Sequence, residues 1–135
     1  MAAVPGRRMD AATQETVVPW LEARASRDLT RLGELTAPDA RWESPVAGVV
    51  HGRAAIVRQV EEGFEDTDRF ASEVLSVECR ADRAVVVIHN TGRREGEELD
   101  SLQMLFLRVA DRLVADVKIA VDDEDAVEAF WQDRT

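Results

Sequence analysis

The spacing of apolar residues changes partway along the chain, and this change limits the fold more than any other feature. In the first half, apolar side chains recur about every four positions, as in Val17, Leu21 and Ala25, which is the spacing of one helix face. From about residue 70 the spacing falls to two, as expected for β-strands. Helices first and strands after are typical of an α+β domain.

The helical half predicts an irregular tail and three helices. Residues 1–13 mix Gly, Pro and Arg without a period, which predicts a flexible N-terminal tail before a single domain at 14–135. Thr16 is a suitable N-cap for the first helix and Asp28 for the second, and Pro38 should end the second. Apolar positions mark a third helix at Ile56, Val57, Val60 and Phe64.

The remaining pattern predicts strands joined by short turns. The expected strands are 41–44, 49–51, 70–79, 84–90, 99–109 and 113–121, and 126–131 can form a final helical turn. Because the last four strands are long and their connections short, we expect them to form an antiparallel meander.

Both faces of the strand at 99–109 carry apolar side chains. One face can pack on the helices, whereas Leu102, Met104 and Phe106 lie on the other. An apolar patch of this size is larger than monomers usually expose. The pattern therefore predicts a homodimer formed through the open face of the sheet.

Composition limits the partners and the compartment. The chain has 135 residues, 45% of them apolar, and 17 basic against 27 acidic residues give a net charge of −10. A negative field of this size disfavours nucleic acid and acidic membrane surfaces as partners. No segment has the ~20 apolar residues of a membrane span, and the first residues lack the apolar core of a signal peptide. We therefore expect a cytoplasmic protein.

The sequence motifs of common cofactor chemistry are missing. GxxxxGK[ST], GxGxxG, HExxH and GxSxG do not occur. His51, His89 and Cys79 have no metal-ligand spacing. We therefore expect neither a cofactor nor a metal.

Three segments resemble the nuclear transport factor 2-like superfamily. "APDARWESPVAGVVHGRAAI" is similar to its connection between the second and third helices, and "VVVIHNTGRREGEELDSLQMLFLRVADRLVADVKIAVDD" to its last three strands. The ending "AFW" resembles that of many SnoaL-like members. The resemblance implies a cone-shaped α+β barrel, with N-terminal helices packed on a curved antiparallel sheet around an apolar pocket. That fold hosts isomerases, dehydratases, cyclases, epoxide hydrolases and non-catalytic binders.

Ketosteroid isomerases within this superfamily use a tyrosine, an aspartate base and a protonated aspartic acid. The resemblance places Trp20, Ser44 and Leu105 at those positions, which argues against isomerase chemistry of that kind. The chain has no tyrosine, which also weighs against the scytalone dehydratase-like and limonene epoxide hydrolase-like families.

SnoaL-like polyketide cyclases are a better match. They use an acid/base aspartate at the end of the last strand, which the resemblance places at Asp122. Strict alternation, however, puts Asp123 on the face of Val117 and Ile119, so either aspartate can be the one that faces the pocket. His89 is the assisting group, although it lies several residues before the cyclase histidine.

Four further residues are expected to contact a ligand: Trp20, Trp42, Gln103 and Glu43. The sequence thus predicts a SnoaL-like protein that binds a small apolar molecule, such as a polyketide, steroid or terpenoid. As an enzyme it would perform cofactor-independent cyclisation, isomerisation or dehydration. The alternatives are a non-catalytic ligand-binding or protein-interaction domain, or an epoxide hydrolase.

Overall fold

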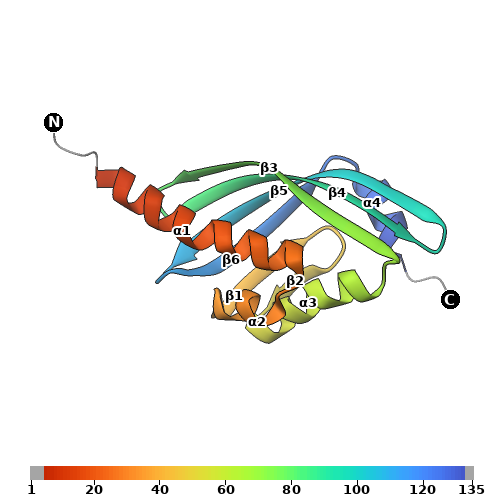
Figure 1. Cartoon of the computed structure of the whole chain (residues 1–135), viewed down its shortest axis with the longest axis horizontal. Helices are drawn as coiled ribbons and strands as arrows, with labels where there is room; N and C mark the ends of the chain where they lie inside the picture. Colours follow the sequence, from red (N-terminus) through yellow and green to blue (C-terminus); the bar gives the residue numbers. More distant parts are fainter. Residues whose placement is uncertain (1–4, 133–135) are drawn as a thin grey trace.

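The computed structural model describes residues 5–132 and contains four helices and six strands in that range (Figure 1). The helices are Pro5–Ser26 (α1), Leu29–Glu34 (α2), Arg53–Glu65 (α3) and Glu124–Trp131 (α4). The strands are Thr36–Ser44 (β1), Gly48–His51 (β2), Arg69–Arg80 (β3), Arg83–Arg94 (β4), Glu97–Ala110 (β5) and Leu113–Val121 (β6).

The strands form one six-stranded sheet in the order β2-β1-β6-β5-β4-β3. The last four strands in sequence pair antiparallel with their neighbours, which confirms the expected meander. β1 pairs antiparallel with β2 but parallel with β6. The α+β fold is therefore confirmed, with the difference that the sheet is mixed and does not close into a barrel.

The first helix begins much earlier than expected. It starts at Pro5, so residues 5–13 are helical rather than an irregular tail, while residues 1–4 lie outside the described range. Thr16 is buried inside the helix instead of capping it. Asp10 accepts a hydrogen bond from the backbone N–H of Ala81, and the Thr13 hydroxyl donates to the Ala81 carbonyl. Because these docking groups are polar, an apolar period could not reveal them.

The second helix and the first strand also differ from expectation. Asp28 caps α2 by accepting a hydrogen bond from Arg31 N at 3.1 Å, as predicted. The helix ends at Glu34, however, and β1 already begins at Thr36. Pro38 lies in the stretch of β1 where the pairing with β6 shifts register. Because proline cannot donate to a ladder, an irregular stretch is where a strand tolerates it.

The core lies between one face of the sheet and the helices. Its largest fully buried members include Trp20 from α1, Leu32 from α2, Ile56 from α3 and Ile88 and Leu105 from the sheet. A second, smaller cluster forms where α4 packs, and its buried members are Leu99, Val127 and Phe130. The two clusters lie on the side of the sheet that carries the pocket described below.

The opposite face of the sheet is apolar and exposed. Leu102, Met104 and Phe106 of β5 are 44%, 39% and 41% exposed, as the alternation predicts. On β3, strict alternation predicts Leu75, Val77 and Cys79 on one face, but the pairing with β4 shifts register between Val74 and Ser76. Leu75 is instead exposed at this bulge.

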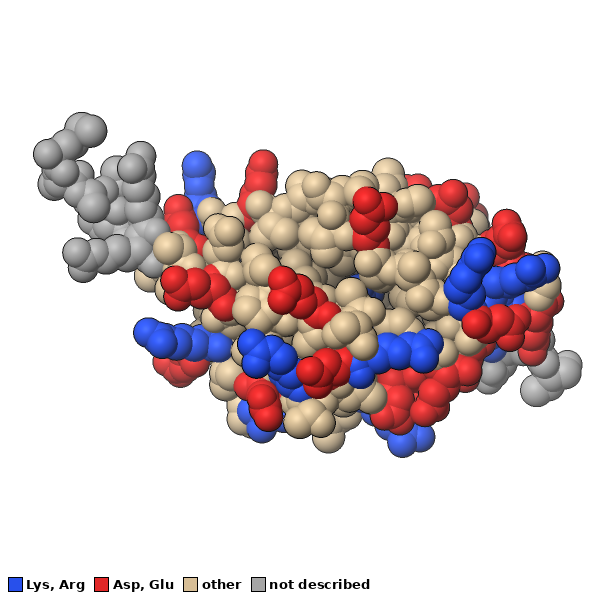
Figure 2. Space-filling view, viewed as in Figure 1, with Lys and Arg blue, Asp and Glu red and all other residues tan. Residues whose placement is uncertain are grey.

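Charged side chains of both signs surround an uncharged area on one face of the molecule (Figure 2). On the face shown in Figure 2, Lys and Arg are interspersed with Asp and Glu rather than gathered in one continuous patch. Within residues 5–132, no helix has the length and apolar character that a membrane span requires.

Candidate ligand-binding pocket

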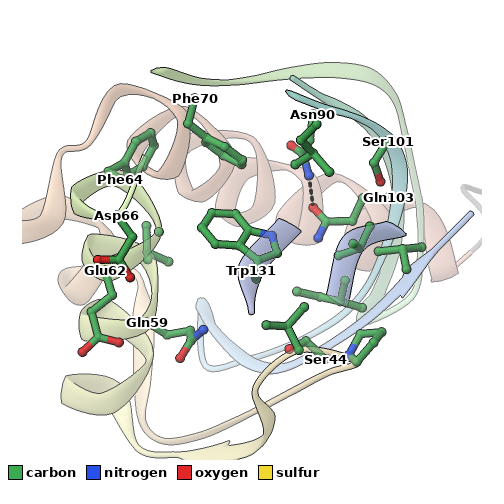
Figure 3. A pocket seen from close by; sticks show the side chains of 18 of the residues that line it. Ser44, Gln59, Glu62, Phe64, Asp66, Phe70, Asn90, Ser101, Gln103 and Trp131 are labelled. Atoms are coloured by element: carbon green, nitrogen blue, oxygen red, sulfur yellow. Dashed lines mark hydrogen bonds between the residues drawn. The ribbon is translucent and has the colours of Figure 1, made fainter. Parts of the chain in front are cut away.

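A pocket with a volume of about 210 Å³ opens between α3, α4 and the inner face of the sheet (Figure 3). Phe64 of α3, Phe70 of β3 and Trp131 of α4 form one wall. The rings of Phe64 and Phe70 lie 5.6 Å apart, and those of Phe70 and Trp131 lie 5.8 Å apart. Other apolar lining residues are Val60, Leu99, Ile119, Val121 and Val127.

One part of the pocket wall is polar and hydrogen-bonded. The guanidinium of Arg24, from α1, donates from Nη2 to Gln103 Oε1 and from Nη1 to Ser72 Oγ, both at 3.3 Å. Asn90 Nδ2 donates to the same Gln103 oxygen at 3.0 Å. The Ser72 hydroxyl donates to Asn90 Oδ1 at 2.6 Å. We call these four residues the Arg24 network.

Arginine fixes the direction of every hydrogen bond in the Arg24 network. Because a guanidinium can only donate, Gln103 must present its oxygen to Arg24. Asn90 donates to that same oxygen and therefore presents its own oxygen to Ser72. The Gln103 amide nitrogen is left without a partner among the described residues, and Figure 3 shows this nitrogen directed into the cavity.

Arg24 is a buried cation without a buried anion beside it. Its residue is 8% exposed, and no carboxylate of the described residues lies within ion-pair distance of it. Burial lowers the pKa of Arg24 to about 10, because loss of solvent disfavours the charged form. The side chain therefore remains protonated at neutral pH.

Two buried side-chain polar atoms in the described residues have no hydrogen-bond partner, and both are donors. They are Arg24 Nε and Trp42 Nε1, and both residues line the pocket. Buried polar groups are normally satisfied. At these two atoms, donors are therefore in excess, and the described residues supply no acceptor to match them.

Two carboxylates, Glu62 and Asp66, also line the pocket where α3 ends. Glu62 accepts a hydrogen bond from Arg58 Nε at 3.0 Å, an exposed pair on the same helix. Ser44 lies at the end of β1, and its hydroxyl accepts from Ala47 N at 2.9 Å. Among the described residues, no group of three or more His, Cys, Asp or Glu side chains could hold a metal ion.

The family model of the SnoaL-like domain matches residues 17–117. The chain belongs to this SnoaL-like family. No curated protein matches the chain at a significant level.

Solved structures show the same fold. Bal32a, from a soil-derived mobile gene cassette, is 28% identical with a TM-score of 0.87, and the match covers 92% of this chain and 99% of Bal32a. A nuclear transport factor 2-like protein from Burkholderia xenovorans LB400 is 17% identical, with a TM-score of 0.78 and 91% and 98% coverage. TerC, co-crystallised with polyporic acid, is 15% identical, with a TM-score of 0.77 and 88% and 97% coverage.

Two of the four predicted ligand contacts line the pocket of this SnoaL-like domain, namely Trp42 and Gln103. Trp20 does not, since it is fully buried in the core, where its Nε1 donates to Thr36 Oγ1 at 3.0 Å. Glu43 lies outside the pocket and pairs with Arg41 at 3.5 Å and with Lys118 at 3.9 Å.

None of the three predicted catalytic residues of the SnoaL-like domain lines the pocket. Asp122 is exposed and accepts a 3.3 Å hydrogen bond from Ser101 Oγ. Asp123 is the N-cap of α4 and accepts from Ala126 N at 3.0 Å. β6 ends at Val121. The strand alternation that predicts one aspartate in the pocket therefore does not extend to Asp122 and Asp123.

His89 lies on the outer face of the sheet. It alternates with the inward-facing Ile88 and Asn90 of β4, and its Nε2 lies 2.6 Å from Asp100 Oδ1. The sheet therefore separates His89 from the pocket of the SnoaL-like domain.

Sequence reasoning missed Arg24, Asn90 and Ser72. A signal for Arg24 was present, because the residue lies seven positions after Val17 and three after Leu21. It therefore falls on the apolar stripe of its helix. A cation on such a stripe is uncommon and marks a site that needs a partner.

Proposed function

We propose that this SnoaL-like domain binds a small, largely apolar molecule that carries a hydrogen-bond acceptor at one end. The observation behind this proposal is the donor excess of the pocket, set against its aromatic wall. Ligand pockets typically combine apolar lining with a few convergent polar groups. The volume of about 210 Å³ suits a ligand smaller than a typical drug, whose pockets begin at about 300 Å³.

The tryptophans provide a direct test of this function. The chain has three, of which Trp42 and Trp131 line the pocket and Trp20 is buried in the core. We expect naphthalene-2-carboxamide, a neutral ring compound with a carbonyl, to shift the indole N–H NMR signals of Trp42 and Trp131. The Trp20 signal is the internal control and should not move.

Two results would contradict ligand binding in the pocket. One is a titration in which none of the three indole signals moves at millimolar probe. The other is an equal shift of all three signals, which would indicate a general change of structure rather than occupation of one site.

Cofactor-independent proton transfer is the second candidate function, and the carboxylates of Glu62 and Asp66 in the pocket lining favour it. A general base must reach the proton that it removes. These two residues meet that condition better than Asp122 and Asp123, which lie outside the pocket.

The predicted roles of Asp122 and Asp123 can be tested separately. We expect Asp122→Asn and Asp123→Asn to change the affinity for naphthalene-2-carboxamide by less than about twofold, since both groups are exposed. Asn also caps helices about as well as Asp, so α4 should persist in the second variant. A large loss of affinity in either variant, measured by the same NMR titration, would mean that this aspartate takes part in ligand binding.

We also propose a homodimer formed through the exposed face of β3, β4 and β5, where Leu102, Met104 and Phe106 gather. Sedimentation at micromolar concentration should give twice the 15.0 kDa chain mass. Phe106→Glu should shift the protein to the monomer, because a charge in an apolar interface is costly. Val49→Glu, at the opposite edge of the sheet, is the control and should leave the dimer intact. A wild-type monomer would refute the interface.

A further inference from the structure

The Arg24 network indicates the charge of the ligand. This inference rests on the proposed function, because it concerns the same pocket. A buried charge is expensive unless it is paired and hydrogen-bonded. Arg24 has no carboxylate partner among residues 5–132, although the chain as a whole carries ten more acidic than basic residues.

The donors of the network exceed its acceptors. A guanidinium has five N–H groups, and the described residues accept hydrogen bonds from Arg24 at two positions, Ser72 Oγ and Gln103 Oε1. The Gln103 oxygen also accepts from Asn90, and the Asn90 oxygen accepts from Ser72. Each side-chain oxygen of the network thus already accepts a hydrogen bond within it. Arg24 Nε and the Gln103 amide nitrogen, by contrast, have no partner among the described residues.

We propose that the ligand is a monocarboxylate with an apolar, ring-bearing body, and that its carboxylate accepts hydrogen bonds from Arg24 and Gln103. A carboxylate supplies both of the things that the network lacks, a negative charge and several acceptor lone pairs. The aromatic wall of Phe64, Phe70 and Trp131 then covers the body of the ligand.

The surrounding charges favour a monoanion over a phosphate ester or a dicarboxylate. Among residues 5–132, Arg24 is the one cation that lines the pocket, whereas Glu62 and Asp66 are also in the lining. A second negative charge on the ligand would find no further cation among these residues and would face the two carboxylates. The net charge of −10 likewise disfavours multiply charged anions at a distance.

Asn90 and Ser72 act as positioning residues in this arrangement. Asn90 donates to Gln103 Oε1 and so holds the amide with its nitrogen toward the cavity. Ser72 joins Asn90 to Arg24 at the other side. The network therefore presents two donor groups in a fixed arrangement before the ligand arrives, which reduces the ordering cost of binding.

The test compares two isosteric probes, 2-naphthoate and naphthalene-2-carboxamide, by calorimetry at pH 7.5, where the carboxylate is fully ionised. We expect wild type to bind 2-naphthoate at least about tenfold more tightly than the carboxamide, because charge-assisted hydrogen bonds are about twice as strong as neutral ones. Arg24→Gln should weaken 2-naphthoate by about 100-fold and so remove its advantage over the carboxamide. Arg31→Gln removes an exposed charge on α2 and is the matched control.

The outcomes separate this inference from the proposed function. Equal affinities of the two probes for wild type, or tighter binding of the carboxamide, would overturn the carboxylate and leave ligand binding standing. If neither probe shifts the Trp42 and Trp131 indole signals, both proposals fail. The wild-type comparison requires no variant, so it decides the question even if Arg24→Gln does not fold.

Discussion

Replacing Arg24 by methionine should stabilise the ligand-free domain by about 1–4 kcal/mol, the range seen when even a paired set of buried charges is replaced by apolar residues of similar volume. Arg24 is 8% exposed and has no carboxylate partner among the described residues. Its burial therefore costs free energy that the hydrogen bonds to Ser72 and Gln103, both 3.3 Å long, only partly offset. Urea unfolding at pH 7 measures the difference.

The control for this prediction is Arg31→Met, which removes the same charge from an exposed position on α2 and should change stability by less than about 0.5 kcal/mol. The opposite result for Arg24→Met is informative. A loss of 3 kcal/mol or more is typical of breaking a paired buried charge. It would mean that the hydrogen bonds of Arg24 already compensate for the burial of its charge in the ligand-free protein. The donor excess of the pocket would then not indicate a missing ligand.

The same residue gives a pH dependence with a definite sign. Burial lowers the pKa of Arg24 from its usual value to about 10, so between these two values the unfolded chain binds more protons than the folded one. Stability must then rise with pH across that interval. The free energy of unfolding of the wild-type protein should therefore increase relative to that of Arg24→Met as the pH rises from about 9 toward 12. Burial also raises the pKa of Cys79, which acts in the opposite direction but is common to both proteins and cancels in the comparison.

Most of the fold could be predicted because short-range sequence patterns indicate its helices and strands. The alternation in β5 assigned Leu102, Met104 and Phe106 to one face and Leu105 and Leu107 to the other, and the structure agrees. The start of α1 could not be predicted in this way. Its first turns are fixed by polar groups that reach the turn after β3, as in the contact of Asp10 with Ala81, 71 residues further along the chain.

The site was harder to predict, because it depends on which residues tertiary structure brings together. Gln103 was identified because an amide in the middle of an apolar strand needs partners. The resemblance to the cyclases places Asp122 at the pocket, whereas Asp123 is placed there by extending an alternation past the end of β6. Asp123 is in fact a helix N-cap, a role that its position three residues before Ala126, ahead of an apolar helix, could have indicated.

Arg24 illustrates the remaining gap between sequence and site. Its place on the apolar stripe of α1 is visible in the sequence. Its partners, Ser72 and Gln103, lie 48 and 79 residues away along the chain, and no local pattern links them to it. Sequence alone can thus indicate that a residue requires a partner, whereas the fold is needed to say which partner is missing.

Phe130→Ala should have the largest effect on stability and should also weaken binding, because this ring anchors α4. Phe130 is 2% exposed and packs with Leu99 and Val127. Gly92 lies beside this ring, since a Cβ there would be 3.6 Å from Phe130 Cζ, an ordinary contact distance. Arg94 adds hydrogen bonds from Nη1 to the carbonyls of Phe130 and Gln132, both at 2.9 Å.

Truncating a buried phenylalanine typically costs about 3–5 kcal/mol, and here the loss should also reach the pocket. Trp131 follows Phe130 directly, its ring lies 4.9 Å from the Phe130 ring, and it forms part of the aromatic wall. We therefore expect Phe130→Ala to lower the urea midpoint strongly and to broaden or shift the Trp131 indole signal. It should also weaken 2-naphthoate at least about tenfold, because the aromatic cover is lost.

Phe130→Leu is the matched control, since it keeps an apolar anchor of similar size and should cost less than about 1.5 kcal/mol. The comparison separates the packing of α4 from the hydrogen bonds that Arg94 donates. These bonds go to backbone carbonyls, so they do not depend on the side chain at position 130. If Phe130→Ala keeps the wild-type midpoint and affinity, α4 unfolds separately from the sheet. Trp131 would then not be a fixed wall of the pocket, and a ligand would be held by α3 and the sheet without it.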